Sequence, residues 1–423
     1  MRITNGRVFN GSCFVEGDVF INEGLFVEES AYVDDGAVVN AAGMTVAPGL
    51  IDLHFHGAVG FDFCDATPQS LAAIAAYEAS QGVTAICPAT MTFTEETLLP
   101  IMANAAAFTP AADQAALVGI NMEGPFISPN KVGAQNPLYV QQADGHMLER
   151  LQKASGGLIK LVDIAPEEPG ALEFIAREHE SVRISVAHTC ASYDDAAAAF
   201  DAGARHVTHL YNAMPGLHHR NPGPIAAAAE RDDVTPEIIC DGVHIHPAMV
   251  RLAFRLFGPQ RMILISDTME AAGLADGEYS LGGQPVTVRG KHATLHDGTL
   301  AGSNTNLALC LGTAVREMGI PLEHALRAAT LNPACALGIQ GSRGSIAAGK
   351  VADCILLDDQ VRVQQVVLRG QPLYARQQKR ARLPQMCAAI SGSFPRPCKL
   401  NIGGFQPAAE RGRKQLPVCL FGI

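Results

Sequence analysis

Short apolar runs alternate along most of the chain with longer stretches in which apolar side chains recur every three or four positions. The short runs, rich in Val and Ile, predict strands, and the longer stretches predict helices that pack by one face. Strands that alternate with helices pair in parallel, and eight such units favour a closed (β/α)₈ barrel of the TIM type over an open sheet. The eight predicted strands are Gly49–Leu53, Thr84–Ala89, Leu117–Met122, Ile159–Ile164, Arg183–Ala187, His206–His209, Glu237–Cys240 and Met262–Ser266.

The two ends of this alternation have a different pattern. Residues 1–47 and 344–375 contain short strand-like segments separated by Gly and Asp turns, which predicts one small β-sandwich domain built from both chain ends. The catalytic barrel is then expected over residues 48–343, with a β-rich insert at about 277–300. Residues 376–423 mix basic residues, Pro and Gly without periodicity, which predicts a basic, disordered tail.

Composition limits the classes of function. The 423 residues are 48% hydrophobic and carry a net charge of −11, which argues against a nucleic-acid partner because phosphate backbones need clustered positive charge. No stretch approaches the ~18 apolar residues needed to cross a membrane, and the N-terminus lacks the apolar stretch of a secretion signal. The 11 cysteines form no CxxC pair and indicate reduced thiols. These features predict a cytoplasmic protein that does not associate with membranes.

Two histidines follow the first predicted strand. Side chains alternate along a strand, so His54 and His56 lie on the same side and face the barrel interior. Two imidazoles at this spacing suit a divalent metal ion, although an isolated pair is more often two hydrogen-bonded core histidines.

Other predicted strands end on residues that can also bind a metal ion or move a proton. Function in a parallel barrel gathers at the C-terminal ends of the strands, where Glu123, His188 and His209 offer one oxygen and two nitrogen ligands. Three protein ligands and an open position for water are typical of catalytic zinc. Asp267 can take a proton from metal-bound water and return it to a leaving amine, or else act as a further ligand or a cap.

The segment after the seventh strand adds a candidate for carbonyl polarisation. His244 follows that strand in the sequence Asp241-Gly242-Val243-His244 and can polarise a substrate carbonyl. His246 lies two residues further and is the alternative, although Pro247 indicates a turn there.

Four segments carry a resemblance to a known family. Pro48–Gly57 resembles the opening strand of the amidohydrolase superfamily. Glu123–Phe126, Thr208–Met214 and Asp267–Gly273 resemble, more narrowly, the N-acetylglucosamine-6-phosphate deacetylases. The resemblance covers residues 1–375 and implies metal-dependent hydrolysis of the acetamide of N-acetyl-D-glucosamine 6-phosphate, a reaction of amino-sugar metabolism.

The same resemblance implies a metal centre. Glu123, His188 and His209 would hold the catalytic ion, and His54 and His56 match relatives that hold a second ion, so one or two ions per subunit are expected. Zn²⁺ is the first choice, and Fe²⁺, Co²⁺ or Mn²⁺ also suit nitrogen and oxygen ligands.

Catalytic and substrate-binding roles are implied in the same way. Asp267 would be the acid and base, and His244 the group that polarises the carbonyl. Asn212 and Ala213 match a phosphate-contacting pair, and Arg220 matches an arginine that reaches the phosphate of the neighbouring subunit, which implies a homodimer. The implied substrate contacts are Ala134, Gln135, Asn212, Ala213, Arg220, His244, Leu300, Ala301 and Gly302.

One position departs from the family pattern. Gln135 stands in Gly133–Pro137 where the family usually has a substrate-contacting histidine. Glutamine can donate and accept hydrogen bonds but cannot become a cation, so the identity of the sugar is left open. Deacetylation of N-acetylgalactosamine 6-phosphate is therefore an alternative.

Two further alternatives come from other classes of protein. Cyclic-amide hydrolases of the dihydroorotase kind typically carry a carboxylated lysine at the end of strand four, whereas the only lysine of that strand, Lys160, lies at its start. An inactive barrel that binds a sugar phosphate or a protein is the non-enzyme alternative. The complete set of candidate ligands together with Asp267 argues against it.

Overall fold

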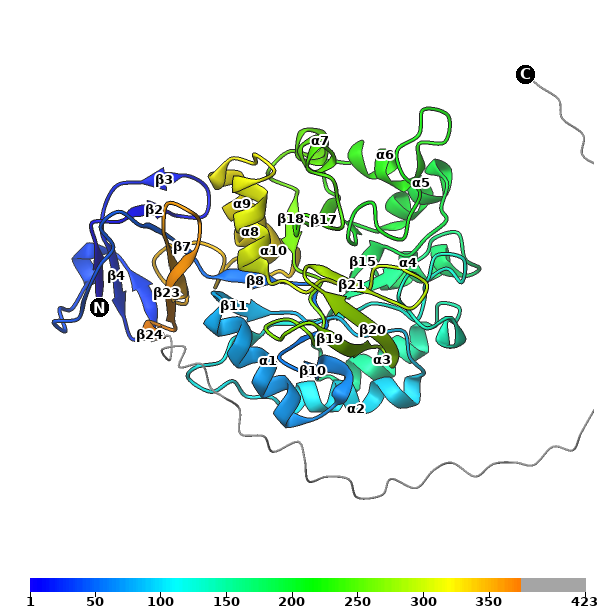
Figure 1. Ribbon diagram of the computed structural model, residues 1–423, viewed down its shortest axis with the longest axis horizontal. Coiled ribbons are helices and arrows are strands. Elements are labelled where there is room, and N and C mark those ends of the chain that lie inside the picture. The colour runs from blue at the N-terminus through cyan, green and yellow to red at the C-terminus, as the bar shows by residue number, and fades with distance from the viewer. Residues whose placement is uncertain (374–423) are drawn as a thin grey trace, which may run out of the picture. The chain divides into compact units, whose positions relative to one another are not determined.

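Eight parallel strands form the barrel of the computed structural model, which describes residues 1–373 (Figure 1). This confirms the (β/α)₈ prediction; the basic tail predicted for residues 376–423 lies outside the described residues. The barrel strands are β8 (Leu50–Asp52), β11 (Val83–Ile86), β13 (Ile120–Met122), β14 (Ile159–Ile164), β15 (Arg183–Val186), β16 (His206–Val207), β17 (Thr235–Ile239) and β18 (Ile263–Ile265).

Backbone hydrogen bonds connect neighbouring strands around the barrel. β13 to β18 pair in sequence order, and β8 pairs with β11. A parallel bridge between Ala89 and Asn121 joins β11 to β13, and a short strand, β12 (Ala116–Leu117), also pairs with β11. On the other side, the backbone N–H of Asp267 donates to the carbonyl of His54 over 3.0 Å. The barrel therefore closes next to two of the predicted site residues.

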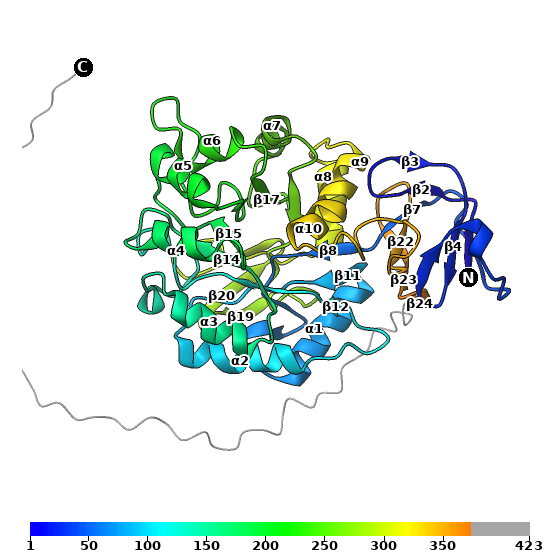
Figure 2. The same cartoon turned by 180° about the vertical axis from the view of Figure 1, so that it is seen from behind.

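Helices follow the strands and cover the barrel (Figures 1 and 2). Their starts follow from local chemistry: Thr67 accepts a hydrogen bond from the backbone N–H of Ser70 at the start of the first, and Ser192 forms a capping box with Asp195. The helices are α1 (Pro68–Ser80), α2 (Glu95–Ala107), α3 (Gly145–Ala154), α4 (Ala171–Glu178), α5 (Tyr193–Ala202), α6 (Gly223–Ala229), α7 (Pro247–Phe257), α8 (Leu307–Arg316), α9 (Leu322–Ala329) and α10 (Leu331–Ala336).

Two sheets from both ends of the described chain form the predicted β-sandwich. One has the order β5-β4-β1-β6 and the other β24-β23-β22-β7-β2-β3, and the apolar side chains of Ile3, Val46, Leu356 and Val367 share its buried core. The domain boundaries drawn at residues 47 and 344 stay a prediction. The strands are β1 (Arg2–Thr4), β2 (Arg7–Phe9), β3 (Phe14–Val15), β4 (Val19–Asn22), β5 (Leu25–Val27), β6 (Val38–Asn40), β7 (Thr45–Pro48), β22 (Cys354–Leu357), β23 (Val363–Leu368) and β24 (Gln371–Leu373).

A three-stranded antiparallel sheet follows β18, within the predicted insert. Its Leu281 packs with Met91 and Met269 in a small apolar cluster beside the site. Among residues 1–373, none of the helices has the length and apolar character needed to span a bilayer. The remaining elements are β19 (Gly277–Leu281), β20 (Gln284–Arg289), β21 (His292–Thr294), the hairpin β9 (Gly57–Ala58) and β10 (Phe61–Asp62), and the 3₁₀ turns Glu29–Ala31, Phe63–Asp65 and Pro137–Tyr139.

Candidate active site

A cavity of about 240 Å³ lies at the C-terminal ends of the barrel strands and contains most of the predicted site residues. Of the remaining ones, His54 and Ala301 are fully buried, and Arg220 is exposed on the loop after β16. A larger groove of about 600 Å³ lies beside the β-sandwich but has no histidine in its wall. The predicted residues that line the cavity are His56, Glu123, Ala134, Gln135, His188, Asn212, His209, Ala213, His244, Asp267, Leu300 and Gly302.

Three side chains converge on one point of this cavity, and we call them the rim cluster: Glu123, His188 and His209. Glu123 Oε1 lies 2.9 Å from His188 Nε2 and 3.1 Å from His209 Nε2, and the two nitrogen atoms are 3.0 Å apart. All three residues are at most 5% exposed. Residues that are 65 and 86 positions apart from Glu123 thus meet at contact distance, as the ends-of-strands argument predicts.

The hydrogen bonds of the rim cluster fit a bound cation. His188 Nδ1 lies 3.0 Å from the backbone carbonyl of Lys131, which only accepts, so Nδ1 carries the proton of the neutral ring. His188 Nε2 then presents a lone pair to the oxygen of Glu123 and to the ring of His209. Lone pairs that converge in a buried place need a positive charge between them, and one carboxylate with two imidazoles is a ligand set of catalytic zinc.

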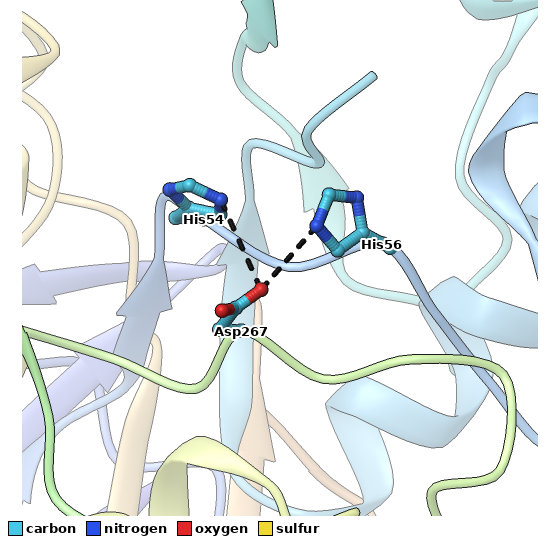
Figure 3. A group of neighbouring side chains, drawn as sticks. All are labelled: His54, His56 and Asp267. Atoms are coloured by element: carbon cyan, nitrogen blue, oxygen red, sulfur yellow. Dashed lines mark ion pairs between the residues drawn. The ribbon is translucent and has the colours of Figure 1, made fainter. Parts of the chain in front are cut away.

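A second group of possible ligands adjoins the rim cluster. His54, His56 and Asp267 each offer an atom within 4.8 Å of the others, and Figure 3 shows both rings turned toward the carboxylate. His56 Nε2 lies 3.3 Å from both Asp267 Oδ1 and Glu123 Oε2. His54 Nε2 has no hydrogen-bond partner within the part of the chain that the structure describes. This arrangement fits a second cation next to the first.

A carboxylate below the site orients His54. Glu237 Oε2 accepts from His54 Nδ1 over 2.9 Å, which leaves Nε2 as the atom free to bind a metal ion. Glu237 Oε1 lies 3.0 Å from Nε2 of His206, whose Nδ1 lies 2.7 Å from the hydroxyl of Thr235. We call Glu237, His206 and Thr235 the lower cluster. The sequence analysis missed it, although a charged residue that begins an apolar strand should have indicated a buried partner.

The charges of these groups shift one another's pKa values. Burial alone would lower the pKa of His54, but the carboxylates of Glu237 and Glu123 outweigh burial and raise it well above its ordinary value. Burial would raise the pKa of Glu237, but His54 and His206 outweigh it and lower the pKa to about 2. Burial likewise opposes ionisation of Asp267, and the hydrogen bond with His56 and the nearby imidazoles lower its pKa. The metal-free site thus favours ionised carboxylates.

The backbone bends sharply where the strands deliver these residues. His188, His209 and Asp267 have φ angles of 43°, 27° and 51°, in the left-handed region that residues other than glycine rarely adopt. Such strain persists where the surrounding structure enforces it and is concentrated at functional sites. Each bend turns a side chain from the end of its strand into the cavity.

His244, rather than His246, faces the cavity. His244 Nδ1 lies 2.7 Å from Asp241 Oδ2, and Asp241 also accepts from the backbone N–H groups of Val243 and His244. Burial lowers the pKa of His244, but Asp241 outweighs burial and raises it, which favours a ring able to donate to a carbonyl oxygen. His246 is exposed, and its ring accepts from the N–H of Ala248 at the start of α7.

Gln135 and Arg220, the two residues expected to set substrate preference, lie in different surroundings. Gln135 is 3% exposed and donates to Glu123 Oε2 over 2.8 Å. Arg220 is exposed, and its Nη1 lies 2.7 Å from Nε2 of the adjacent His219. No Lys or Arg from residues 1–373 lines the cavity. A phosphate bound there would therefore need a cation from elsewhere.

Comparisons with known proteins agree with this geometry. A sequence profile described as the amidohydrolase family matches residues 45–373. The chain belongs to the amidohydrolase family. Hydrolases of this family use metal ions, and the ligand set of the rim cluster fits one. Glu123 and His209 also form, together with His54, a group that could hold a metal ion.

Within this family, the chain is similar to enzymes that are named as deacetylases of sugar phosphates. The chain is 38% identical to N-acetylglucosamine-6-phosphate deacetylase of Bacillus subtilis (strain 168), over 78% of this chain and 84% of that protein. It is 35% identical to N-acetylgalactosamine-6-phosphate deacetylase of Escherichia coli O157:H7, over 77% and 87% respectively. A solved structure of an aspartate-to-alanine mutant of the Mycobacterium smegmatis N-acetyl-D-glucosamine-6-phosphate deacetylase, in complex with N-acetyl-D-glucosamine-6-phosphate, superimposes with a TM-score of 0.82 at 35% identity, covering 88% of this chain and 98% of that one.

Proposed function

We propose that this member of the amidohydrolase family hydrolyses the acetamide of N-acetyl-D-glucosamine 6-phosphate to D-glucosamine 6-phosphate and acetate. The observation that carries the proposal is the convergence of Glu123, His188 and His209 on one point, with Asp267 beside His56 at the same cavity. Relatives named for this reaction span most of the chain at 34–38% identity.

The residues of the site divide the chemistry among them. Glu123, His188 and His209 would hold a divalent metal ion, which would supply Lewis acidity toward the acetamide carbonyl and would make water a stronger acid. Asp267 accepts the proton that water loses as it adds to the carbonyl carbon. Asp267 then returns this proton to the amine nitrogen as the C–N bond breaks, and His244 donates a hydrogen bond to the carbonyl oxygen.

The metal content is part of the proposal. We assign Zn²⁺ as the first choice, because two imidazoles and a carboxylate suit it, while Fe²⁺, Co²⁺ and Mn²⁺ accept the same ligands. His54 and His56 would hold a second ion with Asp267, which gives one or two ions per subunit.

The chain is assigned to the cytoplasm, in line with the eight free thiols among residues 1–373.

Phosphate recognition requires a second subunit in this proposal. Asn212 and Ala213 line the cavity, but the exposed Arg220 lies outside its wall. In a homodimer, Arg220 of one subunit would reach the cavity of the other, where its planar guanidinium could bind the phosphate with two hydrogen bonds. Leu300, Ala301, Gly302, Ala134 and Gln135 would complete the pocket.

Acetate release tests the proposal directly. The protein is purified without added metal, its metal content is measured by elemental analysis, and acetate release is followed from the 6-phosphates of both N-acetyl hexosamines. The expected result is faster hydrolysis of the glucosamine derivative. Faster hydrolysis of the galactosamine derivative would establish the second candidate, which the 35% identical galactosamine relative favours. Absence of acetate from both substrates would reject the proposal.

Arg220→Ala tests the phosphate contact, with the exposed Arg255→Ala on α7 as the matched control. The expected result for Arg220→Ala is a KM at least about tenfold higher for the phosphorylated substrate, since a charge-assisted contact is lost. Arg255→Ala should leave KM unchanged. Equal activity of the unmodified protein on unphosphorylated sugars would contradict a role for Arg220.

A further inference from the structure

The Gln135 side chain connects two fixed points of the site. Its Oε1 accepts from the backbone N–H of Thr92 over 2.7 Å, and its Nε2 donates to Glu123 Oε2 over 2.8 Å. A backbone N–H can only donate, so the amide oxygen must face Thr92 and the NH₂ group must face the carboxylate. The orientation of the amide is thus determined by its partners.

The segment that carries Thr92 packs closely against the residue that follows Glu123. Gly124 follows Glu123 with a φ of 80°, and a Cβ atom at that glycine would meet the Thr92 hydroxyl oxygen at 2.1 Å. Only a glycine allows this close approach of the two segments. Thr92, Glu123 and Gln135 are each at most 3% exposed, so these hydrogen bonds are largely shielded from bulk water.

The hydrogen bond from Gln135 distinguishes the two oxygen atoms of Glu123. Oε2 receives the amide hydrogen bond and lies 3.3 Å from His56, whereas Oε1 faces the nitrogen atoms of His188 and His209. Without the donor, the carboxylate could rotate about its last bond and exchange these roles. A hydrogen bond to a ligand's second atom is how proteins orient metal-binding carboxylates.

We propose that Gln135 is a positioning residue that holds the Glu123 carboxylate so that Oε1 faces the metal site, in addition to any contact with the sugar. This inference rests on the metal-dependent part of the proposed function. It gives Gln135 a role in metal affinity that can be measured without substrate.

The test is zinc affinity of the metal-stripped protein, measured by competition with a chromophoric chelator. Gln135→Met roughly keeps the shape of the side chain but removes both the donor to Glu123 and the acceptor for Thr92, and we expect it to lower zinc affinity about 10-fold to 100-fold. Gln135→His instead introduces an imidazole, which has one nitrogen that can accept from Thr92 and one that can donate to Glu123. This variant should therefore recover part of the lost zinc affinity. Far-UV circular dichroism and thermal unfolding confirm that each variant folds.

Gln284→Leu is the matched control. Gln284 donates to the backbone carbonyl of Ala134 over 2.5 Å and so holds the same loop without touching Glu123. If the effect of Gln135→Met on zinc affinity comes from the orientation of the Glu123 carboxylate rather than from the order of the loop, Gln284→Leu should change zinc affinity less than about twofold. An equal loss in Gln284→Leu and Gln135→Met would overturn the positioning role.

The remaining outcomes separate this inference from the proposed function. Unchanged zinc affinity in Gln135→Met, with a higher KM for the sugar phosphate, would reduce Gln135 to a substrate contact and overturn the inference alone. Failure of the unmodified protein to bind zinc, iron, cobalt or manganese would instead overturn the metal site itself. Reduced zinc affinity in Gln135→Met supports the inference whatever its effect on KM.

Discussion

The rim cluster and the lower cluster are each built around a buried glutamate and buried histidine in the same barrel, yet they differ in how their hydrogen-bond donors and acceptors are matched. In the lower cluster, Glu237 accepts from both neighbouring imidazoles and from the backbone N–H of His209, and His206 has partners at both ring nitrogens. In the rim cluster, the nitrogen atoms of His188 and His209 face each other and one carboxylate oxygen.

This difference separates a structural cluster from a metal-binding one. Buried polar groups are tolerated when each donor meets an acceptor, and the lower cluster meets that condition. His209 Nδ1 and His54 Nε2 lack partners within residues 1–373, which is costly unless something else binds nearby. Both clusters contain a buried glutamate and buried histidine, so the matching of donors and acceptors is what distinguishes them.

Asp267→Asn should have the largest effect of the substitutions, and this effect should be on the rate of catalysis. The amide cannot accept and return a proton, so kcat should fall by about 10³-fold, within the range for general acid–base catalysis. Elemental analysis should still find the ion held by the rim cluster, at least one per subunit. Turnover equal to that of the unmodified protein would reject Asp267 as the proton carrier.

Glu237→Gln should mainly reduce stability. The pKa of about 2 lies below the ordinary 4.5, so ionised Glu237 stabilises the fold above about pH 4.5, and this contribution is lost as the pH falls toward 2. The free energy of unfolding at pH 7 should drop by about 3 kcal/mol in the metal-stripped variant. Urea unfolding between pH 7 and pH 3 provides the measurement.

The pH dependence supplies the control for Glu237. The gap in unfolding free energy between the two proteins should narrow as the pH falls from about 4.5 toward 2, because Glu237 of the unfolded state then takes up a proton while the folded state keeps its charge. A gap that stays constant down to pH 3 would show that the ion pairs of Glu237 are not the source of its stabilisation.

Zinc should stabilise the stripped protein mainly through the rim cluster. At 100 times its dissociation constant, zinc should add about 2.7 kcal/mol to the free energy of unfolding. His188→Ala should remove most of this response, whereas Glu237→Gln should retain most of it. Thermal unfolding with and without zinc measures both, and a full response in His188→Ala would contradict the assigned ligands.

Thr235→Val should have the smallest effect. It removes the hydroxyl that pairs with His206 Nδ1, and one lost hydrogen bond costs about 1 kcal/mol of stability. Zinc affinity should be unchanged in chelator competition. A clear loss of zinc affinity would show that the two clusters are coupled more tightly than their separate hydrogen bonds suggest.

Most of the barrel could be predicted because its signal is local. All eight predicted strands are present, and the apolar alternation that marks them depends on neighbouring residues only. The sixth ends two residues earlier than predicted, at Val207, because Thr208 and His209 turn out of the strand, the latter with a φ of 27°. The rule that function gathers at strand ends predicts that Glu123, His188, His209 and Asp267 lie close together, as the structure shows.

What could not be predicted depends on pairing between distant parts of the chain. Glu237 and His206 each begin a strand-like run, and nothing in either run indicates that the other lies 3.0 Å away. The hydrogen bonds of Gln135 depend on loop conformation, for which no periodicity exists. Its family position indicated a sugar contact, whereas the structure also places its amide on Glu123.

The sandwich has a consequence for how the protein is made. β7 pairs with β2 nearby in sequence, but its other neighbour, β22, begins at Cys354. At ribosomal speeds of about 5–20 residues per second, the roughly 300 intervening residues take about 15–60 s to emerge. Throughout that interval one edge of β7 has no partner, so release or stalling of the nascent polypeptide before Cys354 would leave an open edge on which other chains could assemble.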